Sequence, residues 1–246
     1  MGKITSSRKS IYIRIDEGRK SSMNIVQKLY KQFTCNLTGR RALAVVLGNI
    51  ILGFGCALLA YSLMGNEPYT AMNMAMSGGF GMGLGNYQLI VNFILLIAQL
   101  VWGRKYIGFG SIVNMFFLGY IIEFSGYAIQ AMFGSSEGNN FGLCLIIMVI
   151  AFLFMTFGLS MYQIAAVGVS PYDYVAWGLS DHFPIPFFAS RMIGDFCCVL
   201  VIVIAVFSGL ITWQTSHLGI GTIVGAFCLG PFINFFNKYN RIWIEK

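Results

Sequence analysis

The sequence predicts an all-α membrane protein that crosses the bilayer six times, built from two similar three-helix halves in opposite orientations. The chain of 246 residues is 57% hydrophobic and only 10% charged, whereas soluble domains carry about a quarter charged residues. Several nearly uncharged apolar runs reach the length of about 18 residues that a membrane helix needs. A pattern of glycine, proline and tyrosine recurs in one order in both halves, which indicates a duplicated unit.

Residues 1–41 form a basic arm, since they hold ten of the sixteen lysines and arginines. Apolar residues recur in it at helical spacing opposite two lysines, which predicts a short amphipathic helix on the membrane surface. This pattern comprises Ile25, Val26, Leu29 and Phe33, with Lys28 and Lys31 opposite. The clustered charge indicates affinity for anionic lipid headgroups, and we expect no nucleic-acid partner.

Six spans are expected after the arm, three in each half. We place them near Ala42–Met64, Asn86–Trp102, Ile107–Phe133, Phe141–Val167, Phe187–Trp213 and Leu218–Asn237. The first membrane repeat then covers residues 42–133, the second covers 141–237, and a basic tail occupies 238–246. Between the first and second spans of each half lies a short proline-started segment, which we expect to be a half-helix too short to cross a bilayer.

Charge asymmetry predicts that both termini are cytoplasmic. With the N-terminus inside, every lysine and arginine except Arg191 falls in a cytoplasmic segment, and the outer connections carry none. This is the positive-inside bias of multi-pass proteins, and it requires an even number of crossings. Arg191 lies within the fifth span, near its inner end.

The duplication is seen when the sequence is shifted by 103 positions and, after an eight-residue insertion, by 111 positions. The shift matches Gly65 with Gly168, Pro68 with Pro171, Tyr69 with Tyr172, Gln88 with Arg191, Asn92 with Asp195, Gly108 with Gly219 and Glu123 with Asn234. Three spans per copy is an odd number, so the second copy enters from the opposite side, as in inverted-repeat transporters. The two half-helices are then expected to dip from opposite faces and meet near the midplane. The alternative is that both lie flat on the interface.

The proline motif and a later glycine motif resemble the YczE/YyaS/YitT family of bacterial integral membrane proteins. The family shows Gly-x-Ser-Pro-x-Asp after a hydrophobic helix and Gly-x-Gly-Thr opening a later one, matched here at 168–173 and 219–222. The resemblance covers about residues 47–236 and implies a multi-pass protein of the bacterial cytoplasmic membrane. It does not indicate which substrate such a protein would bind. The first half departs from the pattern, because Glu67 replaces the serine and Thr70 replaces the aspartate.

The second proline motif is a candidate substrate site. Ser170, Pro171, Tyr172 and Asp173 have the order of a helix start, in which Ser170 caps, Pro171 takes the first helical position and Asp173 reaches back to the cap. That structural role alone explains the motif. A half-helix N-terminus also presents free N–H groups and a positive dipole end to a carboxylate or phosphate. Pro68 and Tyr69 are the corresponding candidates in the first half.

Polar residues inside the spans are further candidates, because charge within a membrane is costly and therefore often functional. Arg191 and Asp195 lie four residues apart on one helical face. They form either a structural ion pair or a site at which Asp195 binds a proton or a cation. Gln88 and Asn92 repeat the spacing without charge. The remaining candidates for a polar path are Asn114, Glu123 and Gln163, for which hydrogen bonding between helices is the alternative.

The sequence therefore favours a secondary transporter of a small polar or anionic metabolite, with its site between the repeats and a proton coupled through Asp195. The alternatives are a membrane scaffold or accessory protein of a biosynthetic or export complex, and a substrate-binding subunit of a larger importer. We expect no enzymatic activity, no cofactor and no metal site, because no catalytic or ligand spacing is present. Glycine-rich spans can pack within one chain or between two, which leaves a homodimer open.

Overall fold

The structure is a computed structural model that describes residue 33, residues 37–214 and residues 216–244. Within this part of the chain all regular structure is helical, and no strand occurs. The amphipathic helix expected on the basic arm lies outside the described residues, apart from Phe33.

Five of the described helices are long and apolar enough to cross a membrane. They are α3 (Gly39–Tyr61), α5 (Leu84–Trp102), α6 (Phe109–Phe133), α7 (Phe141–Ala165) and α9 (Phe187–Phe207). Helix α10 (Ile220–Ile244) supplies a sixth span if its two segments, bent by 53°, count as one crossing. The chain is thus a multi-pass membrane protein whose described part is all-helical.

Two predicted boundaries in the second half were wrong by more than one turn. Helix α9 ends at Phe207 and not near Trp213, because the amides of Leu210 and Ile211 both return to the carbonyl of Ala205 and close the helix. The last helix continues through the polar tail to Ile244. Its end is held to α7 by the buried Asn240, whose amide donates to the Ser160 hydroxyl at 2.9 Å.

The bend in α10 has a covalent cause. Pro231 lies inside the helix, and a proline there has no N–H to donate to the carbonyl four residues earlier. The ring also clashes with that carbonyl, and sharp kinks of helices are almost always found at such positions. The two straight segments, Ile220–Phe227 and Leu229–Ile244, meet just before Pro231.

The two proline motifs form the half-helices α4 (Pro68–Gly79) and α8 (Pro171–His182). Each has 12 residues and carries its proline at the first turn, where the missing N–H leaves no hydrogen bond unmade. At about 1.5 Å per residue each is roughly 18 Å long, too short to cross a hydrocarbon core of about 30 Å.

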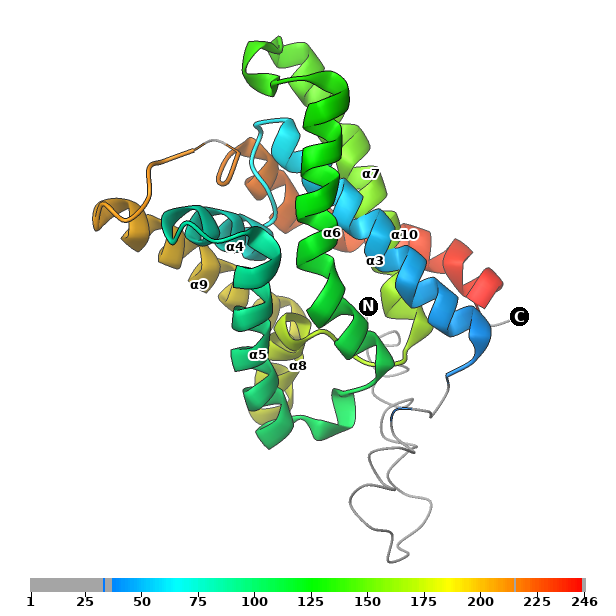
Figure 1. Ribbon diagram of the computed structural model, residues 1–246. Helices are drawn as coiled ribbons and strands as arrows, with labels where there is room; N and C mark the ends of the chain where they lie inside the picture. Colours follow the sequence, from blue (N-terminus) through cyan, green and yellow to red (C-terminus); the bar gives the residue numbers. More distant parts are fainter. Residues whose placement is uncertain (1–32, 34–36, 215, 245–246) are drawn as a thin grey trace, which may run out of the picture.

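The helices pack in two groups (Figure 1). Helices α3, α6, α7 and α10 form one group, in which α3 crosses α7 closely through small residues. A Cβ atom on Gly55 would lie 2.6 Å from the Met155 nitrogen, and one on Gly158 would lie 2.4 Å from the Leu52 nitrogen. Helices α4, α5, α8 and α9 form the other group, and α5 joins the two through α6. The short 3₁₀ helices η1 (Arg104–Tyr106) and η2 (Ser136–Gly138) lie in connections.

The segments that lead into the two half-helices are held by matching backbone hydrogen bonds. Before α4, the Met64 carbonyl accepts from Gly221 at 2.6 Å, and the Asn66 amide donates to the His217 carbonyl at 3.1 Å. Before α8, the Val167 carbonyl accepts from Gly110 at 2.9 Å, and the Val169 amide donates to the Tyr106 carbonyl at 2.9 Å. Each half-helix is therefore anchored to the helix start of the other half of the chain.

Glycine is required at the centre of both junctions. Gly65 has φ +96° and Gly168 has φ +129°, a region that side chains other than glycine rarely adopt. A Cβ on Gly65 would lie 2.3 Å from the Gly219 nitrogen, and one on Gly168 would lie 2.7 Å from the Ser111 hydroxyl oxygen. Backbones approach here more closely than any side chain permits.

Candidate functional site

The N-termini of α4 and α8 are each capped by a hydroxyl and a carboxylate that lie three residues apart. The two groups stand in opposite order in the two half-helices. At α8, the Ser170 hydroxyl accepts from the Asp173 amide at 3.1 Å and donates to the Asp173 carboxylate at 2.8 Å. At α4 the carboxylate is the cap, since Glu67 accepts from the Thr70 amide at 2.8 Å and from its hydroxyl at 2.6 Å. The first half therefore keeps a hydroxyl and a carboxylate three residues apart, although it departs from the sequence motif.

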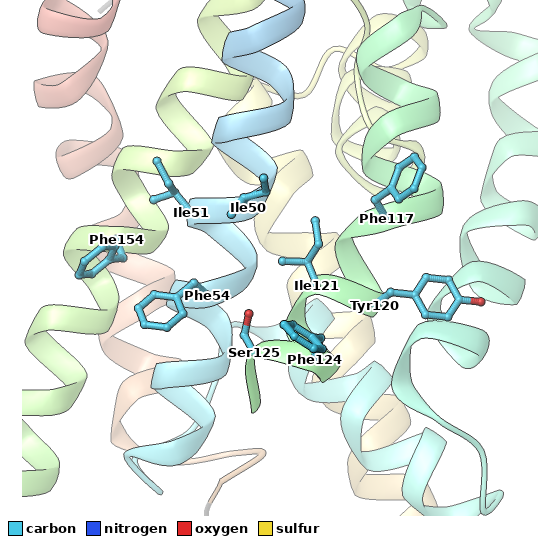
Figure 2. Close-up of a pocket in the computed structure, with 9 residues that line it drawn as sticks. All are labelled: Ile50, Ile51, Phe54, Phe117, Tyr120, Ile121, Phe124, Ser125 and Phe154. Atoms are coloured by element: carbon cyan, nitrogen blue, oxygen red, sulfur yellow. The ribbon is translucent and has the colours of Figure 1, made fainter. Parts of the chain in front are cut away.

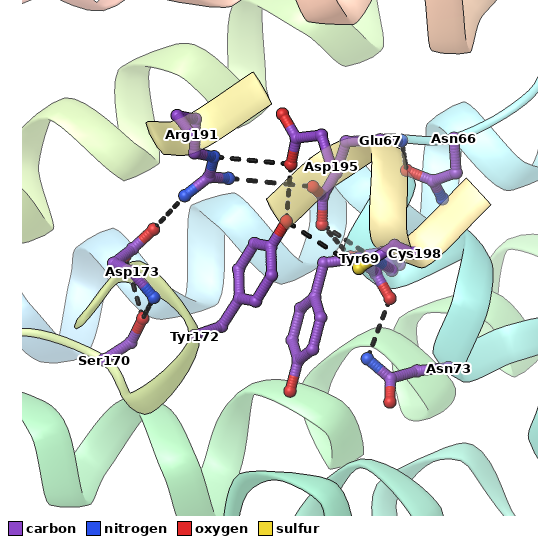
Figure 3. Close-up of polar contacts among 11 residues, drawn as sticks. Asn66, Glu67, Tyr69, Asn73, Ser170, Tyr172, Asp173, Arg191, Asp195 and Cys198 are labelled. Atoms are coloured by element: carbon purple, nitrogen blue, oxygen red, sulfur yellow. Dashed lines mark hydrogen bonds and ion pairs between the residues drawn. The ribbon is translucent and has the colours of Figure 1, made fainter. Parts of the chain in front are cut away.

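Arg191 connects the two half-helices to α9 (Figure 3). Its Nη1 forms an ion pair with Asp173, its Nε lies 3.5 Å from an Asp195 oxygen, and its Nη2 lies 3.9 Å from a Glu67 oxygen. The guanidinium also lies over the Tyr172 ring, 4.7 Å from the centroid. We call Glu67, Asp173, Arg191 and Asp195 the charged cluster; it places three carboxylates around one cation.

Two tyrosines stack beside the charged cluster. The rings of Tyr69 and Tyr172 are 3.9 Å apart and nearly parallel, at 9°, and both residues are buried. Their hydroxyls point in opposite directions (Figure 3). Tyr172 donates to Asp195 at 2.5 Å, and Tyr69 donates to Asn92 on α5 at 2.7 Å. The stack thus links the charged cluster to the amides of α5.

The charges of the cluster are mostly removed from solvent. The three carboxylate side chains are 13–17% exposed and Arg191 is 26% exposed. Burial raises the pKa of Glu67, which precedes α4, and the attraction of Arg191 offsets only part of that rise. Since carboxylates that share a site cannot all ionise cheaply, the cluster can hold a proton and exchange it for another cation.

A cavity of about 470 Å³ reaches the cluster between α9 and α10. Its wall includes Asp195 and the first residue of α4, Pro68, and is otherwise largely apolar. The remaining lining residues are Met192, Phe196, Val199, Trp213, Leu218, Gly219, Thr222, Ile223, Ala226 and Phe227. Of the charged cluster, only Asp195 lines this cavity.

A second hollow, of about 530 Å³, lies between α3, α6 and α7 (Figure 2). No charged side chain lines it. Its nine lining residues are Ile50, Ile51, Phe54, Phe117, Tyr120, Ile121, Phe124, Ser125 and Phe154. An apolar surface of this kind on membrane helices suits lipid chains better than a polar solute.

The other residues predicted for the site lie on separate contacts. Asn114 donates to the buried Asn49 of α3 at 2.8 Å, and Glu123 accepts from the Gly85 amide at the start of α5 at 2.8 Å. Gln163 is half-buried near the end of α7. Gln88 is buried on α5, one turn before Asn92, against Gly119 of α6.

Sequence reasoning missed one member of the cluster, Glu67. The signal was present, because Glu67 precedes Pro68 as Ser170 precedes Pro171, and a carboxylate is a good helix cap. Recognising that Glu67 and Thr70 exchange the roles of Ser170 and Asp173 would have found it. Among the described residues, no group of three or more His, Cys, Asp or Glu side chains is arranged to hold a metal ion.

Comparisons with known proteins agree with the membrane assignment. A family described as "Family of unknown function (DUF6198)" matches residues 39–238. The chain is 24% identical over 187 residues to the uncharacterized protein YyaS of Bacillus subtilis, covering 76% of this chain and 87% of YyaS. It is 23% identical over 127 residues to the uncharacterized membrane protein YczE of the same organism. This match covers 51% of this chain and just over half, 56%, of YczE. No solved structure matches significantly. The resemblance to YczE and YyaS is confirmed, and the relation to YitT stays an expectation from the motifs.

Proposed function

The chain belongs to the DUF6198 family of unknown function, and we propose that it is a secondary transporter of a small polar solute. The proposed site is the charged cluster with the stacked tyrosines, where α4 and α8 meet. The observation that carries the proposal is that one arginine joins carboxylates from both half-helices and from α9. Transporters with inverted repeats place their sites at such a junction of broken helices.

Exchanged contacts support an inverted repeat. Met64 and Val167 are related by the shift of 103, and Gly110 and Gly221 by the shift of 111. The carbonyl of Met64 bonds to Gly221, and that of Val167 bonds to Gly110. A two-fold axis between the halves produces such an exchange of partners, and the antiparallel pair of Tyr69 and Tyr172 fits on that axis. In this proposal α4 and α8 enter the bilayer from opposite faces.

The charge balance favours a solute that carries positive charge. Three carboxylates face one guanidinium, and the caps of Glu67 and Ser170 already accept an N–H at each half-helix N-terminus. An anion would therefore enter an excess of negative charge, whereas a cation would neutralise it. The sequence predicted a small polar or anionic metabolite, and the charge balance favours a polar solute with positive charge over the anion.

Coupling to protons follows from the same excess of carboxylates. Protons and a cationic solute compete for one set of oxygens, so the arrival of one releases the other. Asp195 is the member of the cluster that lines the cavity between α9 and α10, and it also accepts from Tyr172. We assign Asp195 as the coupling carboxylate, because it is the acid that the solute reaches first from the cavity.

The experiment has two stages. A thermal-shift screen of amino acids, polyamines and guanidino compounds on the purified full chain identifies ligands, and those that stabilise it are then tested for uptake into proteoliposomes. Asp195→Asn keeps the side-chain size and is expected to abolish uptake driven by a pH gradient. Glu137→Gln removes a carboxylate in the distant η2 turn and is expected to leave uptake unchanged. Gradient-driven uptake that survives Asp195→Asn would reject the coupling role.

A further inference from the structure

Two buried side-chain amides of α5 carry atoms that lack hydrogen-bond partners among the described residues. Gln88 and Asn92 are each 1% exposed, and they lie one turn apart on the same face of the helix. Neither Nε2 nor Oε1 of Gln88 has a partner among the described residues, and the same holds for Nδ2 of Asn92. An amide group buried without a partner loses its hydrogen bonds to water and gains none in return, so its presence needs an explanation.

Of the two equivalent positions in the second half, one lines the cavity between α9 and α10. Gln88 corresponds to Arg191 and Asn92 to Asp195 under the shift of 103. Asp195 lines the opening between α9 and α10, whereas the corresponding gap between α5 and α6 is closed. A Cβ on Gly119 of α6 would lie 3.0 Å from the Gln88 oxygen. The two halves thus differ in which helix pair has separated.

Two side chains hold the α5–α6 pair shut. The Glu123 carboxylate accepts from the Gly85 amide at 2.8 Å, at the positive N-terminal end of α5. The Tyr120 hydroxyl donates to Asn86 at 2.7 Å. The shift of 111 replaces Glu123 by Asn234 and Tyr120 by Pro231. The second half therefore lacks the carboxylate and the hydroxyl of this contact and has a bent helix in their place.

We propose that Gln88 and Asn92 form a second binding subsite, which opens when α5 separates from α6 and there takes an uncharged oxygen-bearing group of the solute. This proposal rests on the proposed transport function. The unpartnered atoms are two amide nitrogens, which donate, and one amide oxygen, which accepts. They suit a hydroxyl or carboxamide group.

The subsite adjoins the charged cluster through the tyrosine stack. Asn92 accepts from Tyr69, Tyr69 stacks on Tyr172, and Tyr172 donates to Asp195. A solute with a cationic end and a neutral polar end can therefore meet carboxylates from one side of the stack and amides from the other. In the present structure α9 and α10 are apart and α5 and α6 are in contact. The two-fold relation between the halves implies a second state in which α5 and α6 are apart and α9 and α10 are in contact.

Cysteine accessibility tests the opening without knowledge of the solute. The full chain carrying Gln88→Cys is reconstituted in liposomes and treated with a quaternary-ammonium methanethiosulfonate, which reacts with thiolates in contact with water. Labelling is read by mass spectrometry of the peptide that contains residue 88, so the native cysteines stay in place. The control is Ile94→Cys on the same helix, where the side chain is 63% exposed on the outer face of the bundle.

The expected result is labelling of Gln88→Cys about tenfold faster than of Ile94→Cys, because a minor open state of a few per cent is enough to admit the reagent. Adding Glu123→Gln, which weakens the α5–α6 contact, is expected to raise the rate further. If Gln88→Cys does not fold, Asn92→Cys takes its place. Labelling no faster than that of Ile94→Cys, with and without Glu123→Gln, would overturn the subsite. Labelling without any solute uptake would instead reject the transport function and leave the opening in place.

Discussion

Tyr69 and Tyr172 lie face to face at 3.9 Å, and their hydroxyls bond in opposite directions to Asn92 and Asp195. These two side chains come from the first turns of the two half-helices. The contact therefore fixes the meeting point of α4 and α8. It also connects the charged cluster to the uncharged amides of α5.

Tyr172→Phe removes one hydrogen bond and keeps the stack. Loss of the bond to Asp195 is expected to lower stability by about 1–2 kcal/mol, because the acceptor is ionisable and largely buried. Tyr172→Leu also loses the stacking on Tyr69 and is expected to cost about 1 kcal/mol more. Unfolding midpoints in detergent measure both. Equal midpoints for the two variants would show that the stack contributes nothing.

Arg191→Gln leaves three carboxylates without their shared cation. We expect a loss of about 2 kcal/mol, smaller than for a fully buried pair because Arg191 is 26% exposed. Adding Asp173→Asn, which removes the nearest of the acids, should restore part of that loss. Thermal unfolding of the single and double variants measures the coupling. A double variant less stable than Arg191→Gln would argue against electrostatic compensation.

The raised pKa of Glu67 predicts a pH-dependent stability. A carboxyl whose pKa is higher in the folded state binds more protons there than when unfolded. Its contribution is full below the ordinary value of 4.5 and is lost as pH rises through the folded value. The charged groups that face Glu67 are Arg191 and Asp195 of α9, and Thr70 of its own turn donates to it.

Unfolding midpoints over a pH series compare the wild-type chain with Glu67→Gln. The wild-type midpoint is expected to fall as pH rises above 4.5, and the variant, which cannot ionise at this position, is expected to vary less. Identical pH profiles would contradict the assignment of that titration to Glu67.

Gly65→Ala and Gly168→Ala test the two junctions. Both positions have positive φ, and the new methyl group would approach backbone or side-chain atoms within 2.3 and 2.7 Å. We expect each substitution to cost more than about 1 kcal/mol. Gly126→Ala in α6 is the matched control, since a Cβ there meets nothing within 4 Å. That change is expected to stabilise by about 0.5 kcal/mol, and equal losses at all three sites would refute the packing argument.

Helix positions in this chain follow from local chemistry, and the sequence predicted them well. Pro68 and Pro171 mark the first turns of α4 and α8, because proline is favoured at the first helical position, where its missing N–H breaks no hydrogen bond. Apolar length located the spans. The end of α10 was missed because Asn240 is satisfied by Ser160 of α7, a contact between residues 80 positions apart.

The site was predicted only in part for the same reason. Arg191 and Asp195 are neighbours on one helix, so their pairing can be inferred from spacing. The pairing of Arg191 with Glu67 and Asp173 depends on how two half-helices from different halves meet, which no local pattern encodes. Asn114 was a candidate for the polar path, with hydrogen bonding between helices as the alternative. In the structure it donates to Asn49 in the α3–α6 contact, which is a common use of such side chains in membrane helices.

Solute-driven proton movement in proteoliposomes tests the central claim most directly. A pH-sensitive dye inside the vesicles reports protons when a mixture of amino acids, polyamines and guanidino compounds is added outside. The account predicts a pH change for the wild-type chain and none for Asp195→Asn at equal reconstitution. A folded wild-type protein that moves no protons with any of these solutes, or an Asp195→Asn variant that moves them equally well, would contradict it.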